Sequence, residues 1–404
     1  MKVFEHLLLL SAFWCGANSA FAQTWTQTSA PTNSWRCVAS SADGSKLVAA
    51  VNFGGIYIST NSGVTWETTS AMYAPWVSTA SSADGTKLAA APAYGFIYLS
   101  TNSGATWKQS GAPLRNWVSI ASSADGSKLV AASYLGSIYR STDSGTTWTA
   151  NTNLVEYVIE YQPKVATNAI PVTNWQAVVS SADGTKMTAV TGFSGIYITT
   201  NSGVTWIQSR APNDYEEWFC AASSADGSKL IAAEVPSTYV SANSGMTWGR
   251  SDSPDELWAS VASSADGNKL VLISSYESNV ISGDIYSSAD SGATWISNAA
   301  PKLAWASVAS SADGSKLVAA ANGGGIWTLQ TKPVPQLNLA PLGSNLTVSW
   351  IIPSTIFVLQ QNLDLSTTNW TSVTNPPVLN LANLRNEVIL RPPGSNVFYR
   401  LKTP

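Results

Sequence analysis

The chain has 404 residues, of which 45% are apolar and only 11% are charged. This length exceeds that of one ordinary domain unless the architecture repeats, and the abundance of Trp, Gly, Ser and Thr over helix formers favours an all-β fold. The formal net charge of -3 excludes the strongly basic surface typical of nucleic-acid binding.

The first 22 residues are predicted to form a secretory signal peptide. Lys2 precedes an apolar stretch around residues 7–17, and Ala20-Phe21-Ala22 has the small-x-small pattern of a cleavage site. We expect the mature chain to begin near Gln23 and to be secreted or periplasmic. No later segment has the run of about 18 apolar residues that spans a bilayer.

Cleavage would also remove the single histidine, His6, which excludes histidine metal sites and Ser-His or Cys-His catalysis from the mature chain. Two cysteines would remain, Cys37 and Cys220, each two residues after a Trp that opens a repeat. Equivalent positions in non-adjacent repeats of a ring lie beyond the roughly 7 Å Cα separation that a disulfide allows. We therefore predict two buried free thiols.

A unit of about 41 residues recurs seven times in residues 23–331. The units, numbered in chain order, open with Trp35, Trp76, Trp117, Trp175, Trp218, Trp258 and Trp305. In unit one, four alternating or apolar segments at 35–39, 46–50, 55–59 and 65–66 are separated by an Asp-Gly turn, a Gly-containing loop and an Asn-Ser-Gly turn. Four strands in a unit of this length are typical of a propeller blade, so the repeat predicts seven blades.

The two ends of the repeat predict how the ring closes. Unit seven stops at Gly325-Ile326-Trp327 without a fourth strand, whereas Thr24-Trp25-Thr26-Gln27 is similar to the fourth-strand segment Thr106-Trp107-Lys108-Gln109 of unit two. We expect the N-terminal segment to supply the missing strand and to latch the ring, which removes two exposed sheet edges.

The turn between the third and fourth segments resembles the Asp-box, or bacterial neuraminidase repeat, with the pattern Ser/Thr-x-Asp-x-Gly-x-Thr-Trp. Six copies run from Ser59 to Trp66, Ser100 to Trp107, Ser141 to Trp148, Thr199 to Trp206, Ser241 to Trp248 and Ser288 to Trp295. The acid is present as Asp143 and Asp290, and asparagine replaces it at Asn61, Asn102, Asn201 and Asn243. Either side chain accepts backbone N–H bonds within a tight turn, so we expect the turn to be preserved.

The resemblance implies a propeller fold more than any one activity, because sialidases, sortilin-type receptors, some xyloglucanases and propellers that assist photosystem II assembly share these repeats. Sialidases also have an arginine triad and an Arg-Ile-Pro segment, and this chain has no Arg-Ile-Pro. None of the arginines in the repeat region matches the triad: Arg36, Arg115, Arg140, Arg210 and Arg250. Sialidase chemistry is therefore not carried over.

The turns of a four-stranded blade divide between two faces. One face, here the Asp-Gly face, would hold seven similar Asp-Gly turns and six Asp-box turns. The opposite face, here the variable face, would hold loops that differ in length, charge and aromatic content, and such loops on a rigid scaffold usually carry recognition.

Five units place an aromatic residue in the loop between the second and third strands of the variable face. These candidate ligand-binding residues are Phe53, Tyr94, Tyr134, Phe193 and Tyr276. They are interpreted as stacking platforms for sugar rings or for an apolar peptide. In the alternative interpretation, the rings fill gaps between neighbouring blades.

Acidic residues concentrate in the variable loops of units five and six. They are Asp214, Glu216, Glu217, Glu234, Asp252, Asp255, Glu256 and Glu277. Three interpretations stay open: solvated loop charges, a site for calcium or a cationic partner, and a carboxylate pair for glycoside hydrolysis, with Glu217 and Asp255 as the candidates. We assign no cofactor and no metal to the chain.

Two insertions and a C-terminal module complete the chain. The insertions are predicted at Asn151–Thr173, as an added hairpin arm, and around Ser278–Gly283. Residues 332–335 predict a stiff linker and residues 336–404 a small β-sandwich, with strands at 345–350, 356–361, 369–373, 387–391 and 397–401. This module resembles terminal modules of secreted proteins from environmental bacteria in Leu359-Gln360, Asn369-Trp370-Thr371 and Phe398-Tyr399-Arg400-Leu401, and is interpreted as an attachment or interaction module or as a folding cap.

The sequence thus predicts an all-β chain with a seven-bladed β-propeller, closed by an N-terminal strand and followed by a β-sandwich. The favoured function is secreted, non-catalytic binding of a glycan or protein through the variable face. Two alternatives stay open: a glycoside hydrolase-like enzyme, related to sialidases or xyloglucanases and using loop carboxylates, and a folding or assembly factor resembling the photosystem II assembly propellers. Neither a nucleic-acid partner nor a membrane span is expected.

Overall fold

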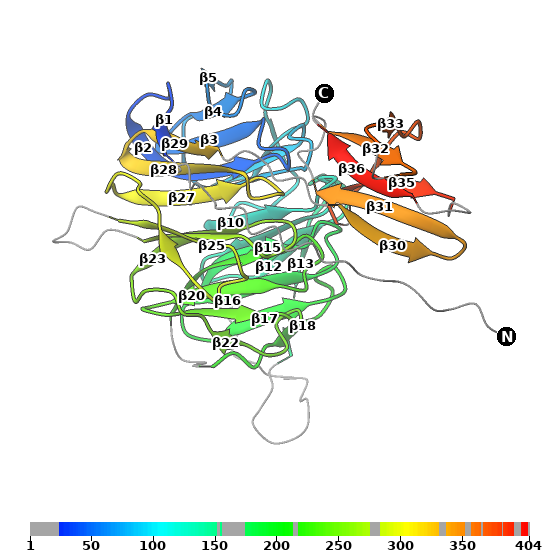
Figure 1. Cartoon of the computed structure of the whole chain (residues 1–404). Coiled ribbons are helices and arrows are strands. Elements are labelled where there is room, and N and C mark those ends of the chain that lie inside the picture. Colours follow the sequence, from blue (N-terminus) through cyan, green and yellow to red (C-terminus); the bar gives the residue numbers. More distant parts are fainter. Residues whose placement is uncertain are drawn as a thin grey trace.

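The computed structural model describes residues 24–151, 154–155, 174–212, 217–274, 283–330, 337–351, 357–364, 367–381, 383–391 and 397–402 (Figure 1). Within these ranges every regular element is a β-strand, and no apolar helix of membrane-spanning length occurs there. The predicted signal peptide, the linker at 332–335, the second insertion up to residue 282 and most of the first insertion lie outside the described residues.

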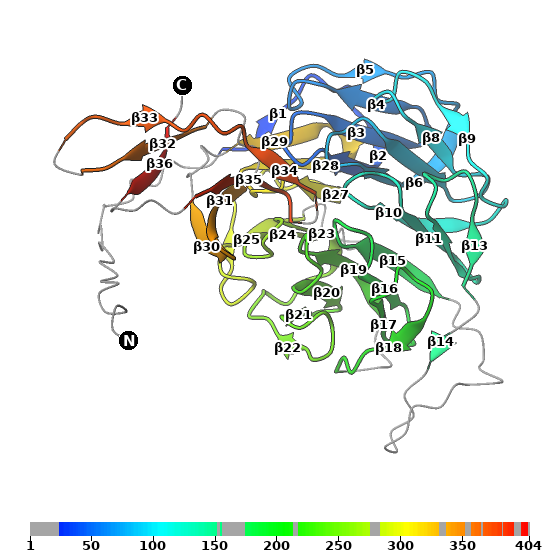
Figure 2. The same cartoon turned by 90° about the vertical axis from the view of Figure 1, so that its right-hand side faces the viewer.

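The strands of each sequence unit pair in chain order, antiparallel to one another, and Figure 2 shows the units following one another around a common centre. The first strands are β2 (Asn33–Ser40), β6 (Ala74–Ser81), β10 (Trp117–Ser122), β15 (Trp175–Ser180), β19 (Trp218–Ser223), β23 (Trp258–Ser263) and β27 (Trp305–Ser310). The second strands are β3 (Leu47–Gly54), β7 (Leu88–Pro92), β11 (Leu129–Ser133), β16 (Met187–Thr191), β20 (Leu230–Glu234), β24 (Leu270–Ser274) and β28 (Lys316–Gly324). The third strands are β4 (Ile56–Ser59), β8 (Tyr98–Ser100), β12 (Ile138–Ser141), β17 (Ile196–Thr199), β21 (Thr238–Ser241), β25 (Ile285–Ser288) and β29 (Ile326–Gln330).

The outermost strands are short. In units one to six they are β5 (Glu67–Thr68), β9 (Lys108–Gln109), β13 (Thr149–Ala150), β18 (Trp206–Gln208), β22 (Gly249–Arg250) and β26 (Ile296–Ser297). In unit seven, the N-terminal strand β1 (Thr26–Gln27) pairs antiparallel with β29. Within the first insertion, Leu154–Val155 form β14, which pairs parallel with β18.

Buried tryptophans organise the interior of each unit. The opening Trp packs edge-on against a Tyr of the third strand, with ring centroids 5.0 Å apart for Trp35 and Tyr57 and 5.3 Å apart for Trp117 and Tyr139. Units two, four, five and six repeat this contact. Edge-to-face packing of this kind adds to the stabilisation from apolar burial, so a Trp in this position has a structural role in units one to six. In unit seven the opening Trp305 packs against Trp25 instead.

The Asp-Gly turns are built by the aspartate side chain. In unit one, Asp43 Oδ1 accepts hydrogen bonds from the Ser41 hydroxyl (2.6 Å) and from the Ser45 amide (2.9 Å). Partial burial alone would raise the pKa of Asp43, but the hydrogen bonds from Ser41 and Ser45 lower it below its usual value. Gly44 lies at φ +66°, a conformation that glycine adopts without strain.

A cycle of backbone hydrogen bonds joins the seven Asp-Gly turns. The amide of the alanine in each turn donates to the carbonyl of the corresponding alanine in the next unit, over 2.6–2.8 Å, through Ala42, Ala83, Ala124, Ala182, Ala225, Ala265 and Ala312. The last bond runs from the Ala312 amide to the Ala42 carbonyl, over 2.7 Å. All seven turns therefore lie around one opening.

The Asp-box turns keep one geometry whether they contain Asp or Asn. Asp143 accepts from the amide and hydroxyl of Thr147 over 2.8 and 2.7 Å. Asn61 accepts from the Thr65 amide over 2.9 Å and donates to the Thr65 hydroxyl over 2.8 Å. The hydrogen bonds from Thr147 lower the pKa of Asp143 to about 2, and the prediction that the substitution preserves the turn is confirmed.

The C-terminal residues form two small sheets beside the repeat units (Figure 1). One contains β30 (Asn338–Leu342), β31 (Asn345–Ile351), β35 (Arg385–Leu390) and β34 (Val378–Asn380), and the other contains β33 (Thr371–Ser372), β32 (Val358–Asn362) and β36 (Phe398–Lys402). Val348, Trp350 and Val388 of the first sheet pack against Leu359 of the second. Two of these strands were not predicted from the sequence: β30 is exposed and contains a proline, and β34 has only three residues.

Candidate functional site

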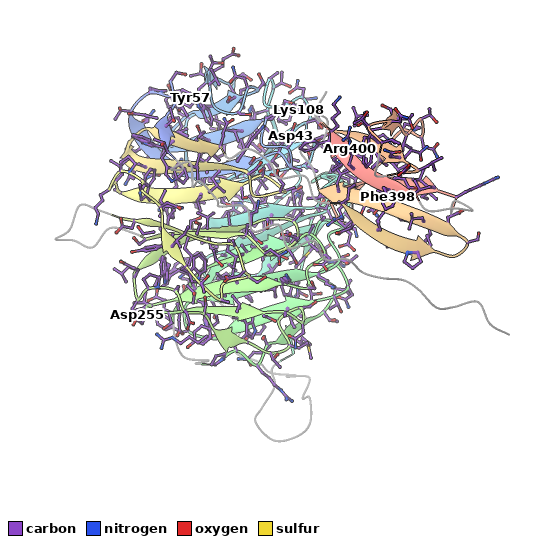
Figure 3. The ribbon with its side chains drawn as sticks, in the orientation of Figure 1. Asp43, Tyr57, Lys108, Asp255, Phe398 and Arg400 are labelled. Atoms are coloured by element: carbon purple, nitrogen blue, oxygen red, sulfur yellow. The ribbon has the colours of Figure 1, made fainter. Side chains whose placement is uncertain are left out.

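Strand pairing sorts the loops between two ends of each unit. In unit three, Ser122 pairs with Leu129 next to the Asp-Gly turn, whereas Trp117 pairs with Ser133 at the opposite end, where the loop to the third strand begins. Because the alanine cycle holds all Asp-Gly turns around one opening, the loops at the opposite ends of the strands gather on the far, variable face. In Figure 3, Asp43 of an Asp-Gly turn is labelled toward the C-terminal sheets, and Asp255 of a variable loop lies on the other side of the molecule.

The predicted aromatic residues of the variable face are solvent-exposed where the structure describes them. The exposed fraction is 78% for Phe53, 67% for Tyr94, 59% for Phe193 and 44% for Tyr134. The alternative in which these rings fill gaps between units is therefore wrong for these four. Tyr276 lies outside the described residues.

Four further apolar side chains, which the sequence analysis did not select, join these aromatics. They are Met72, Tyr73, Leu114 and Leu135, with exposed fractions between 39% and 81%. Tyr73 precedes Ala74, which pairs with Gly54 next to Phe53, and Leu114 precedes Arg115, which pairs with Gly95 next to Tyr94. The eight residues, here called the apolar arc, thus come from the variable face of units one to four in succession. Phe53 was expected in a loop but lies in β3, which extends to Gly54 and pairs with β6.

Two residues of the apolar arc have strained backbones. Phe53 lies at φ +56° and Leu135 at φ +51°, a region that bulky residues rarely adopt. The equivalent segment of unit seven, Asn322-Gly323-Gly324-Gly325, corresponds to Asn52-Phe53-Gly54-Gly55 of unit one. Gly323, at φ +70°, takes the place of Phe53. A strained, exposed aromatic where glycine fits without strain indicates a role outside folding.

A cavity of about 570 Å³ lies along the axis, between the first strands of the units. The position after each opening Trp lines it and differs between units: Arg36, Val77, Val118, Gln176, Phe219, Ala259 and Ala306. Among the described residues that line the cavity, Arg36 is the only charged one, and Asn322 lines it from the last part of β28. The described wall of the cavity therefore carries one basic side chain, Arg36, and is otherwise uncharged.

Both cysteines line this cavity as buried free thiols. Burial raises the pKa of Cys37 to about 12 and that of Cys220 to about 12. Because only the thiolate is nucleophilic, neither side chain is suited to react at neutral pH.

The acidic residues of units five and six do not share one environment. Asp255 forms an exposed ion pair with Arg250, with Nη2 and Oδ1 2.9 Å apart, and Glu217 is partly buried at the start of unit five. Glu234 is not a loop residue: it ends β20 and is only 3% exposed. Asp214, Glu216 and Glu277 lie outside the described residues, and within the described part no three His, Cys, Asp or Glu side chains form a group that could hold a metal ion.

The similarity of this chain to known proteins lies in its structure. No family model and no curated protein sequence matches the chain. A GH74 xyloglucanase from Xanthomonas campestris superposes with a TM-score of 0.58 at 15% identity, covering 81% of this chain and 59% of the xyloglucanase, so the chain spans less than two thirds of that enzyme.

Two other similar structures are matched over nearly their whole length. YCF48 bound to a D1 peptide has a TM-score of 0.52 at 16% identity, covering 77% of this chain and 97% of YCF48. The β-propeller domain of Cps50 (Swd1) from Myceliophteria thermophila has a TM-score of 0.58 at 13% identity, covering 75% of this chain and 98% of that domain. At these identities the similarity defines the fold alone: the chain is an all-β protein with a β-propeller fold.

Proposed function

We propose that this protein is a non-catalytic binding propeller, exported by its N-terminal signal peptide, that holds a ligand on the apolar arc of its variable face. The carrying observation is the arc itself: aromatic and aliphatic side chains exposed over four consecutive units, with Phe53 and Leu135 held at positive φ. Large apolar side chains that are exposed together on one face of a protein commonly mark a binding site.

The proposed scaffold is a closed ring of seven blades, related to the Asp-box propellers and latched by β1. The hydrogen bond from Ala312 to Ala42 supports the closed ring, and the pairing of Thr26 with Thr328 supports β1 as the fourth strand of the last blade. A closed ring gives the variable loops a rigid base, which lowers the ordering cost of binding.

The composition of the arc favours a protein ligand over a glycan. Met72, Leu114 and Leu135 have no ring face on which a sugar can stack, but they suit the apolar side chains of a peptide. YCF48, one of the structural neighbours, is described with a bound D1 peptide, which supports the capacity of a propeller of this size to hold a peptide. The ion pair of Asp255 with Arg250 gives no support to a catalytic pair with Glu217.

Peptide and glycan arrays probed with the mature chain test this proposal. We expect retention of peptides with apolar residues, and loss of that retention by about tenfold or more when Tyr94 and Phe193 are both replaced with alanine. Met246→Ala is the matched control, because Met246 is 53% exposed but lies in an Asp-box turn on the Asp-Gly face. Glycan-only retention would replace the protein ligand with a sugar, and equal effects of the two variants would contradict the arc as the site.

A further inference from the structure

A residue of the C-terminal module lines the opening on the Asp-Gly face. A second cavity, of about 170 Å³, lies there among serines and alanines of the first strands and Asp-Gly turns. Among the described residues that line it, Leu384 alone comes from outside the seven units; it lies in the turn between β34 and β35. The C-terminal module is therefore docked over the end of the axis opposite to the apolar arc.

Leu384 is placed asymmetrically in this opening. It packs against the buried pair Ala42 and Ala312, of units one and seven, and Ala83 and Ala265 of the flanking units two and six pack against the same pair. The alanines of units three, four and five line the cavity but are not part of this apolar cluster. Leu384 thus lies at the junction between the last unit and the first.

This junction is the place where neighbouring units are not consecutive in the chain. It is held by non-covalent contacts, including Ala312 N–H to the Ala42 carbonyl (2.7 Å), Val38 N–H to Ser307 Oγ (3.1 Å) and Lys316 Nζ to Ser62 Oγ (3.1 Å). The strand β1 adds a ladder of two residues. Any contact that bridges the two sides of this junction opposes the opening of the ring.

The residues on either side of Leu384 are hydrogen-bonded within the C-terminal module. Leu384 lies at φ +54°, Asn383 Oδ1 accepts from the Arg385 amide over 3.0 Å, and Glu387 Oε1 accepts from the Asn383 side-chain amide over 2.9 Å. Burial lowers the pKa of Arg385, while the carboxylates of Asp266, in the Asp-Gly turn of unit six, and Glu387 oppose that shift. A leucine kept at positive φ by its surroundings indicates that the conformation serves the contact that it makes.

From these contacts we propose that the C-terminal module is an axial clamp. By inserting Leu384 against Ala312 and Ala42, the β34–β35 turn holds the junction between units seven and one closed. The proposal concerns the Asp-Gly face and stands independently of the ligand proposed for the variable face.

Hydrogen exchange of the mature chain tests the clamp in Leu384→Asp and Leu384→Gly. Both remove the apolar contact, and glycine also removes the left-handed strain, so Leu384→Gly keeps the test valid if the aspartate variant does not fold. We expect segments containing the amides of Val38 and Ala312 to exchange roughly tenfold faster or more, with segments containing the amides of Ala124 and Ala182 unchanged.

Leu381→Asp is the matched control. Leu381 is 42% exposed in the same module and does not line the opening, so this variant should exchange like the unmodified chain. Unchanged exchange at the junction in both Leu384 variants, or equal acceleration around the whole ring, would overturn the proposal. Acceleration in Leu381→Asp equal to that in Leu384→Asp would also overturn it.

Discussion

Replacing Trp25 with alanine is expected to lower the free energy of unfolding of the mature chain by about 3–5 kcal/mol. Trp25 is only 4% exposed, lies 6.2 Å from Trp305 between ring centroids, and shares a buried cluster with Val308 and Leu329 of the last unit. Its removal leaves a cavity where the N-terminal segment meets unit seven, and so weakens the proposed latch. Urea denaturation followed by tryptophan fluorescence and circular dichroism measures the change.

Thr26→Ala provides the control for this measurement. Thr26 lies in the same two-residue strand but is exposed, so its substitution should change stability by less than about 0.5 kcal/mol. If Trp25→Ala were tolerated as well as Thr26→Ala, the N-terminal segment would not be a latch.

Phe53→Gly is expected to separate stability from binding. The ring of Phe53 is 78% exposed and its backbone lies at φ +56°, so glycine loses little burial and relieves strain of about 1–2 kcal/mol. The greater freedom of glycine in the unfolded chain offsets about 0.5–1 kcal/mol of that gain. We therefore expect the free energy of unfolding to stay level or rise by up to about 1 kcal/mol, while affinity for the arc ligand falls by about tenfold or more.

Phe53→Ala distinguishes the ring from the strain. It removes the ring but keeps a side chain at positive φ, so it should lose affinity like Phe53→Gly without the gain in stability. Thermal unfolding and a binding titration on the three proteins give both quantities. A clear loss of stability in Phe53→Gly would contradict the account, because it would show that the ring is structural.

The repeat could be predicted from the sequence because each unit contains the same short sequence patterns. The turns and the opening tryptophans depend on contacts within about 40 residues. The structure contains such contacts between Trp35 and Tyr57 and between Asp143 and Thr147. The positions of Cys37 and Cys220 followed from the same periodicity, and both are buried free thiols.

The residues on which the two proposals rest lie outside that periodicity and were harder to predict from the sequence. Met72 and Tyr73 are ordinary apolar residues in a connection, and only the pairing of Ala74 with Gly54 brings them to Phe53. Leu384 has no local signature, because its role depends on docking a distant module onto Ala42 and Ala312. Glu234 is another such case: the sequence predicts a loop residue, whereas Glu234 is the last residue of β20 and only 3% exposed. In each case the surroundings of the residue depend on tertiary packing, which a short sequence pattern does not encode.

Hydrogen exchange of the mature chain, with and without the peptide that binds best on the array, tests the central claim most directly. We expect slower exchange on the variable face, in the segments around residues 52–54, 72–75, 93–95, 134–136 and 192–194. Exchange in the Asp-Gly and Asp-box turns should be unchanged. Protection confined to those turns or to the C-terminal sheets would contradict a binding site on the apolar arc.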